Sequence, residues 1–316
     1  MKRFLIISID TECDKGPGWR IRYPMSFEGI YRGIGEILQP FFEEYGFRAT
    51  YLLSPEVMED DESISILLDV MRRGAELGTH LHGEFLEPMK RRKPVFTGEM
   101  AAHYPDELEY EKLKNLTTLF VKTFGFQPLS YRAGRFSISS RTVRFLEELG
   151  YRVDSSLTPF SSVSGVDHRR APAYPYYPDY DDIYRPGNSR ILEVPITILP
   201  RNYLLFRILK STPLYRIGRF RRLVKGWFGN IWLRPTVSGA REVGELLRLY
   251  PKMFPGRTVF FNMMFHNVEV VEELSPYDAR MVRRNLREML SVLRDYGFEG
   301  LTLKEVPDEY GRGSVQ

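Results

Sequence analysis

Blocks of apolar residues that suit strands alternate along the chain with blocks of helical spacing. The continuous apolar run at 4–9 is typical of a strand that is covered on both faces. The same reasoning predicts further strands at 48–53, 76–82, 128–131, 151–154, 192–198, 258–264 and 301–303. Helical spacing predicts helices at about 27–45, 64–73, 105–124, 139–149, 239–250 and 276–296. Repeated strand–helix units with short connections indicate a parallel α/β sheet.

Seven or eight such units fit a (β/α) barrel, and we expect an irregular barrel of about seven parallel strands. No internal repeat or linker divides the sequence, so we expect one domain over 1–316, with an insertion at about 155–235. The insertion begins with a segment at 155–190 that is rich in Ser, Pro, Tyr and Asp. A long segment of this kind is usually functional or poorly ordered. Its tyrosines could bind sugar rings or pack together in a surface loop, and both interpretations stay open.

Composition adds limits on the class of protein. The chain is 43% hydrophobic and 14% aromatic, which is typical of a globular protein with a large core. Its formal net charge of +4 is modest, and we expect no nucleic-acid partner. The single cysteine, Cys13, excludes an intrachain disulfide and favours a reducing compartment. We interpret Cys13 as a packed residue.

Two segments bear on location. The first ten residues combine a basic start with an apolar run, but the run is short and lacks a signal-peptide cleavage site. No stretch approaches the roughly 20 apolar residues of a membrane span, so we expect a cytoplasmic protein. Residues 201–234 mix cations with large apolar residues, which could bring the protein to an anionic membrane surface. We prefer the alternative, a helix packed on the barrel with a solvated basic face.

Chemically active side chains follow the ends of several predicted strands. They are Asp10, Glu12, His80, His82, Arg132, Asp154 and His266. Functional groups collect at the carboxyl ends of parallel strands, so we expect these side chains to meet. Three of the five histidines belong to this set, and we expect the other two, His103 and His168, to face solvent.

His80 and His82 are two residues apart, so both rings point the same way from an extended chain. A carboxylate from a neighbouring strand would complete a His₂-carboxylate site with open positions, as catalytic zinc requires. The alternative is a pair of histidines satisfied by backbone hydrogen bonds. Acidic residues at the end of the first strand favour the metal site.

In this order the residues resemble the five motifs of polysaccharide deacetylases of carbohydrate esterase family four, the NodB-homology enzymes. The family's Thr-Phe-Asp-Asp motif corresponds to 8–12, its paired histidines to 78–82, and its Leu-x-His to 264–266. Residues 132–135 stand at the Arg-x-Pro-Tyr motif, and Asp154 stands at the fourth motif. Because order and spacing agree from residue 8 to residue 266, the chain resembles a divergent member of this family.

Departures from the motifs leave two alternatives for metal ligands. Thr11 replaces the family's metal-binding Asp, so we take Glu12 as the ligand and keep Asp14 in reserve. The family's His-x-x-x-His spacing places its second position on Glu84, whereas we favour His82 and keep Glu84 in reserve. The third motif also lacks its Pro and Tyr, which changes the expected shape of the acetyl pocket.

The resemblance implies a divalent metal, which we expect to be zinc, with cobalt, nickel and iron as alternatives. The metal would activate a water and polarise the substrate carbonyl. Asp10 would act as general base and His266 would protonate the leaving amine. Arg132 would orient Asp10, and Asp154 or a neighbour would hold the His266 ring. The alternatives are a structural Arg132–Asp154 ion pair and a helix-capping role for Asp10.

The substrate implied by the resemblance is an N-acylated amino sugar or glycan intermediate, with acetyl as the expected acyl group. Two other functions remain open. One is an amidohydrolase that acts on a small non-sugar amide. The other is a non-catalytic carbohydrate-binding barrel, against which the presence of both Asp10 and His266 argues.

Overall fold

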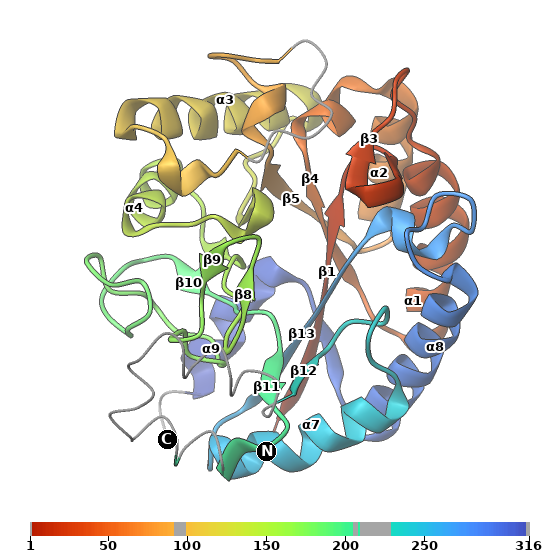
Figure 1. The fold of residues 1–316 in the computed structure, drawn as a ribbon, viewed down its shortest axis with the longest axis vertical. Coiled ribbons are helices and arrows are strands. Elements are labelled where there is room, and N and C mark those ends of the chain that lie inside the picture. The colour runs from red at the N-terminus through yellow and green to blue at the C-terminus, as the bar shows by residue number, and fades with distance from the viewer. Residues whose placement is uncertain (1, 92–98, 205–207, 209–228, 314–316) are drawn as a thin grey trace.

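A curled parallel sheet forms the centre of the protein, and helices lie around its outside (Figure 1). The structure, a computed structural model, describes residues 2–91, 99–204, 208 and 229–313. The sheet strands are β1 (Arg3–Thr11), β4 (Ala49–Leu53), β5 (Glu76–Leu81), β6 (Ser130–Ala133), β7 (Val153–Asp154), β10 (Leu192–Glu193), β13 (Val259–His266) and β14 (Glu299–Leu301). Their order is β10-β7-β6-β5-β4-β1-β13, with β14 also paired to β1. The predicted irregular (β/α) barrel is confirmed.

The two ends of the sheet approach each other through the chain that follows β10. The backbone N–H of Thr197 donates to the carbonyl of Asn262 in β13 at 3.0 Å, and the N–H of Asn262 donates to the Thr197 hydroxyl at 2.8 Å. The Asn262 side chain donates to the carbonyl of Val194 at 3.0 Å. The predicted continuous strand at 192–198 is therefore wrong. β10 ends at Glu193, and β11 (Ile198–Pro200) leaves the sheet to pair with β12 (Asn230–Trp232).

The predicted helices are present, with ends that differ by a few residues. They are α1 (Gln39–Tyr45), α2 (Asp61–Arg72), α3 (Asp106–Phe124), α4 (Ser140–Glu148), α7 (Ala240–Met253) and α8 (Ala279–Asp295). A wider, π-type stretch at Gly29–Leu38 leads into α1, and α9 (Val306–Gly313) was not predicted. Short helical turns lie at Pro17–Trp19, Pro55–Glu59, Gly83–Phe85, Ala101–His103, Gly134–Phe136, Asn267–Val270 and Leu303–Glu305. Gly74 lies two residues after the end of α2 and has a φ of 98°, a left-handed conformation that glycine adopts readily and that is common where helices end.

The tyrosine-rich segment packs against the protein. It contains a small hairpin of β8 (Ser162–Val163) and β9 (Val166–Asp167). The buried Tyr176 hydroxyl donates to the carbonyl of Ile183, and the Tyr180 hydroxyl donates to Glu147 at 2.6 Å. The Tyr174 ring lies under the Arg257 guanidinium, 3.8 Å from its carbon to the ring centroid. These contacts favour the interpretation in which the tyrosines pack.

The expectation that both remaining histidines face solvent is half right. His103 is exposed, whereas His168 is fully buried and accepts the backbone N–H of Thr158 at 3.1 Å. Burial lowers the pKa of His168 to about 4, so its ring is neutral. Both interpretations of 201–234, a packed helix and a membrane contact, concern mainly residues 205–207 and 209–228, which lie outside the described residues. Among the described helices, none combines the length and apolar character needed to cross a membrane.

Candidate metal centre and catalytic residues

The sheet register brings the predicted site residues to one edge. β1 lies between β4 and β13, and its Asp10 is paired in register with His266. β5 lies beside β6, and His80 is paired with Arg132. The carboxyl ends of these strands therefore present their polar side chains to a common space, as parallel α/β folds commonly do.

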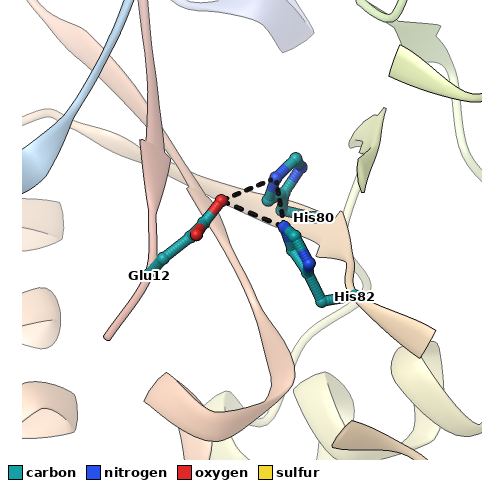
Figure 2. A group of neighbouring side chains, drawn as sticks. All are labelled: Glu12, His80 and His82. Atoms are coloured by element: carbon teal, nitrogen blue, oxygen red, sulfur yellow. Dashed lines mark hydrogen bonds and ion pairs between the residues drawn. The ribbon is translucent and has the colours of Figure 1, made fainter. Parts of the chain in front are cut away.

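Three of these side chains converge (Figure 2). Glu12 Oε1 lies 3.2 Å from His80 Nε2 and 3.0 Å from His82 Nε2, and the two imidazole nitrogens are 3.2 Å apart. All three residues are buried. One carboxylate oxygen and two imidazole nitrogens form a donor set that suits a catalytic divalent cation such as zinc. Glu12, His80 and His82 could therefore hold a metal ion.

Hydrogen bonds behind the rings assign their tautomers. His80 Nδ1 lies 3.1 Å from the carbonyl oxygen of Arg132, and His82 Nδ1 lies 3.3 Å from Glu84 Oε1. Both partners accept, so each Nδ1 carries a proton and each Nε2 is left to bind a cation together with Glu12. Burial opposes protonation of His82, but Glu12 and Glu84 outweigh it and raise its pKa to about 9. Without a metal the cluster therefore holds a proton, which a divalent cation would displace.

The two reserve ligands have other contacts. Glu84 Oε1 also accepts from Arg135 at 2.7 Å, so this carboxylate lies behind His82. Asp14 accepts the backbone N–H groups of Glu28 and Gly29, each at 2.9 Å, at the start of the π-type stretch. Among the described residues, the group that could hold a metal contains neither of them.

Asp10 stands beside the triad as a charged carboxylate. Arg132 Nη1 donates to Asp10 Oδ1 at 2.5 Å, while Oδ2 lies 3.8 Å from His80 Nε2 and 3.9 Å from His266 Nε2. Burial opposes ionisation of Asp10, but the charges of Arg132, His80 and His266 hold its pKa below the usual value. The fully buried Arg132 also donates to Ser8 Oγ at 2.6 Å. Arg132 thus pairs with Asp10 and not with Asp154.

The partner of His266 is Glu269. Glu269 Oε1 lies 2.8 Å from His266 Nδ1 and also accepts from Arg234. The expectation that Asp154 itself holds His266 is wrong. Asp154 in β7 accepts from Ser156 at 2.6 Å and lies opposite Glu193 of β10, where burial raises the pKa of both carboxyls.

The local chain explains the Glu269 contact, because the helical turn Asn267–Val270 brings a side chain three residues after His266 back toward its ring. The sequence signal was an acidic residue three positions after the candidate histidine, within the turn that follows the strand.

A short hairpin after β1 supplies a further contact that the sequence did not indicate. Its strands are β2 (Lys15–Gly16) and β3 (Arg20–Ile21). Lys15 Nζ lies 2.9 Å from Glu12 Oε2, and although burial opposes its charge, Glu12 raises the pKa of Lys15 above the usual value. Burial raises the pKa of the neighbouring Cys13 thiol, which is consistent with a packed residue.

The triad opens into a cavity of about 500 Å³, within the usual size range of small-molecule sites. Asp10 and His266 line it as well. Its remaining wall includes aromatic and cationic side chains that sequence reasoning missed: Trp19, Phe136, Tyr277, Lys15, Arg135 and Arg234. Among the described lining residues there is no tyrosine from 174–184.

No protein-family model matches the chain, and no curated protein matches its sequence. Solved structures that share the fold include the following two. A GH57 branching enzyme from Thermococcus kodakaraensis superposes with a TM-score of 0.54 at 14% identity, covering 98% of this chain and 72% of that chain. A Mycobacterium smegmatis protein with the provisional description of a polysaccharide deacetylase superposes with a TM-score of 0.51 at 13% identity, covering 90% of this chain and 77% of that chain.

The predicted resemblance to the polysaccharide deacetylase fold is confirmed. The same architecture also carries a branching enzyme, so the fold alone does not define the reaction.

Proposed function

We propose that the protein is a metal-dependent hydrolase that removes an acyl group, acetyl in the first instance, from the amide nitrogen of an amino sugar or glycan intermediate. In this proposal it is a divergent relative of the polysaccharide deacetylases. The observation that carries it is the convergence of Glu12, His80 and His82 beside Asp10 and His266 on one cavity. Such a set combines a metal site with a general base and a general acid.

Glu12, His80 and His82 would hold the ion, for which zinc is our first choice and cobalt, nickel and iron are alternatives. When bound, the ion polarises the amide carbonyl and makes a water nucleophilic near neutral pH. The donor set fits this role because both Nδ1 atoms donate away from the site, which leaves both Nε2 atoms for the cation.

In this proposal Asp10 takes the proton of the attacking water. Its Oδ1 is held by Arg132, so its Oδ2, which lies between His80 and His266, is the oxygen that faces the reaction. Arg132 keeps this carboxylate ionised, as a general base requires.

In this proposal His266 protonates the leaving amine. Glu269 accepts from Nδ1 and fixes the ring, while Nε2 lies 3.9 Å from Asp10 Oδ2. The proposed base and acid therefore line the same cavity close to each other, and the ring of Trp19 lies beside the acid.

Metal content and acetate release test the function. Purified protein should contain about one divalent ion per chain, lose activity with EDTA and regain it with zinc, cobalt, nickel or iron(II). It should release acetate from N-acetylglucosamine oligomers. Metal binding with acetate release only from N-acetylated amino acids would favour the small-amide alternative, and failure to bind any of these metals would overturn the proposal.

We also propose a cytoplasmic location, supported by the single cysteine in the sequence. An intracellular sugar intermediate then fits better than mature cell-wall polymer. Contact with a membrane surface through 201–234 stays an untested alternative to a packed helix.

A further inference from the structure

The β2–β3 hairpin carries an aromatic side chain into the candidate site. Trp19 follows Gly18 in its turn and has a φ of 59°, in the left-handed region that bulky residues rarely adopt. The hairpin is fastened at its base, because the buried Lys15 bonds to Glu12. Backbone conformations of this kind persist where the surrounding structure enforces them, often at ligand sites.

Trp19 lies on the leaving-group side of the cavity. Its ring centroid is 4.6 Å from that of His266 and 6.4 Å from that of Tyr277, and both Trp19 and Tyr277 line the cavity. If His266 protonates the departing nitrogen, the part of the substrate that carries this nitrogen must lie next to His266. The acyl group lies on the other side, toward Glu12, His80 and His82. Trp19 is thus beside the amine-bearing part of the substrate.

The character of this wall favours a pyranose ring as that part. An aromatic face carries partial negative charge and attracts the C–H groups that one face of a pyranose presents, while the hydroxyl groups at the ring edge remain free for polar partners. Arg234 is a polar side chain that lines the cavity beside this wall. Its guanidinium carbon lies 5.5 Å from the centroid of the Trp232 ring and 5.9 Å from that of the Tyr277 ring. A small aliphatic amide would leave most of the cavity of about 500 Å³ unused.

We infer that Trp19 is a sugar-stacking residue that positions the pyranose carrying the acylated nitrogen against His266. This inference rests on the proposed function for the direction of the substrate. It makes the hairpin a specificity element, anchored by Lys15 to the metal site and carrying the ring on which the sugar lies.

Binding of an N-acetylglucosamine trimer to zinc-loaded protein, measured by calorimetry, tests the inference apart from turnover. Trp19→Ala should weaken binding roughly tenfold, whereas Trp19→Phe, which keeps a ring, should retain most of it. Tyr296→Ala is the matched control, because Tyr296 is an exposed aromatic residue at the end of α8 and should leave binding unchanged. Zinc content should be the same in all four proteins.

Kinetics provide the second measurement. On the trimer, Trp19→Ala should raise KM by a similar factor, while hydrolysis of N-acetylethanolamine, which has no ring, should change little. Equal binding of the trimer by wild type and Trp19→Ala would overturn the stacking role and leave the proposed function standing. Trimer binding that depends on Trp19, without acetate release from any acylated sugar, would contradict the proposed function and the placement against His266, and would support only the stacking role of Trp19. No binding of the trimer by the wild type would overturn the inference.

Discussion

The two sides of the cavity are built from different parts of the fold. On one side, which we call the metal side, the candidate metal ligands Glu12, His80 and His82 lie at the ends of central strands or directly after them, and all three are buried. On the other side, Trp19 and Tyr277 come from connections and are partly exposed. The metal side is thus fixed by the sheet, whereas the opposite wall depends on how loops pack.

This difference indicates that the strand ends carry the chemistry and that the loops recognise the substrate. Strand ends hold atoms to the accuracy that metal binding and proton transfer need, because the sheet register fixes their spacing. Loops can change their side chains without disturbing that register, which suits the recognition of a particular substrate. Substitutions on the metal side should therefore abolish the chemistry, and those on the opposite wall should change affinity.

The largest effect is expected from removing a metal ligand. His80→Ala or His82→Ala should reduce bound zinc to near zero and lower activity roughly a thousandfold or more, because the remaining ligands leave the ion weakly held. Metal analysis and acetate assays measure both effects. Asp14→Asn is the control: it should keep the metal and lose roughly 1 kcal/mol of stability through weaker bonds to Glu28 and Gly29. Loss of metal in Asp14→Asn alone would reverse this assignment.

A smaller effect is expected at the general base. Asp10→Asn should lower kcat by about 10²- to 10⁴-fold while zinc stays bound, since the amide cannot take the proton of the attacking water. Steady-state kinetics and metal content, measured on the same sample, distinguish loss of the base from loss of zinc. If kcat remains within a few-fold of wild type, Asp10 is not the base.

Two carboxylates behind the histidines allow a direct comparison. Glu84→Gln should weaken metal affinity about 10- to 100-fold, because Glu84 supports His82. Glu269→Gln should leave metal affinity unchanged and lower kcat, because Glu269 supports His266, which is the proposed acid and is not one of the three candidate ligands. Zinc titration with a competing chelator, together with kcat, distinguishes the two variants. Equal loss of metal affinity in both variants would contradict the assignment of His82 as a ligand and His266 as the acid.

The smallest effect concerns a buried carboxyl outside the cavity. Asp10 has Arg132 at 2.5 Å, whereas Glu109 in α3 is 3.4 Å from Arg141, and burial raises the pKa of Glu109 from 4.5 to about 7. The folded state then binds the proton more tightly than the unfolded state, so stability should fall by roughly 2 kcal/mol as pH rises from about 4.5 to 7.

Urea unfolding between pH 4.5 and 8 measures the slope of the free energy of unfolding against pH. Glu109→Gln should flatten it, and the exposed Glu107→Gln on the same helix is the matched control that should not. An unchanged slope in Glu109→Gln would show that another group holds the proton.

The order of strands and helices could be predicted from the sequence, because local periodicity reflects which face of each element is buried. The strand expected at 192–198 could not, because Thr197 and Asn262 hold this segment against β13 after β10 has ended. That contact joins residues far apart in sequence, so the local pattern of apolar residues cannot predict it.

The candidate site divides in the same way. The sequence alone singled out Asp10, His80 and His266, because it shows directly which chemically active residues stand at the end of a predicted strand. Tertiary structure decided that Glu12 rather than Asp14 faces the imidazoles, and that Glu84 lies behind His82. It also brought Glu269 to His266 and Trp19 to the cavity. The physical reason is that periodicity fixes which way a side chain leaves its own strand, whereas its partners depend on register and on how loops pack.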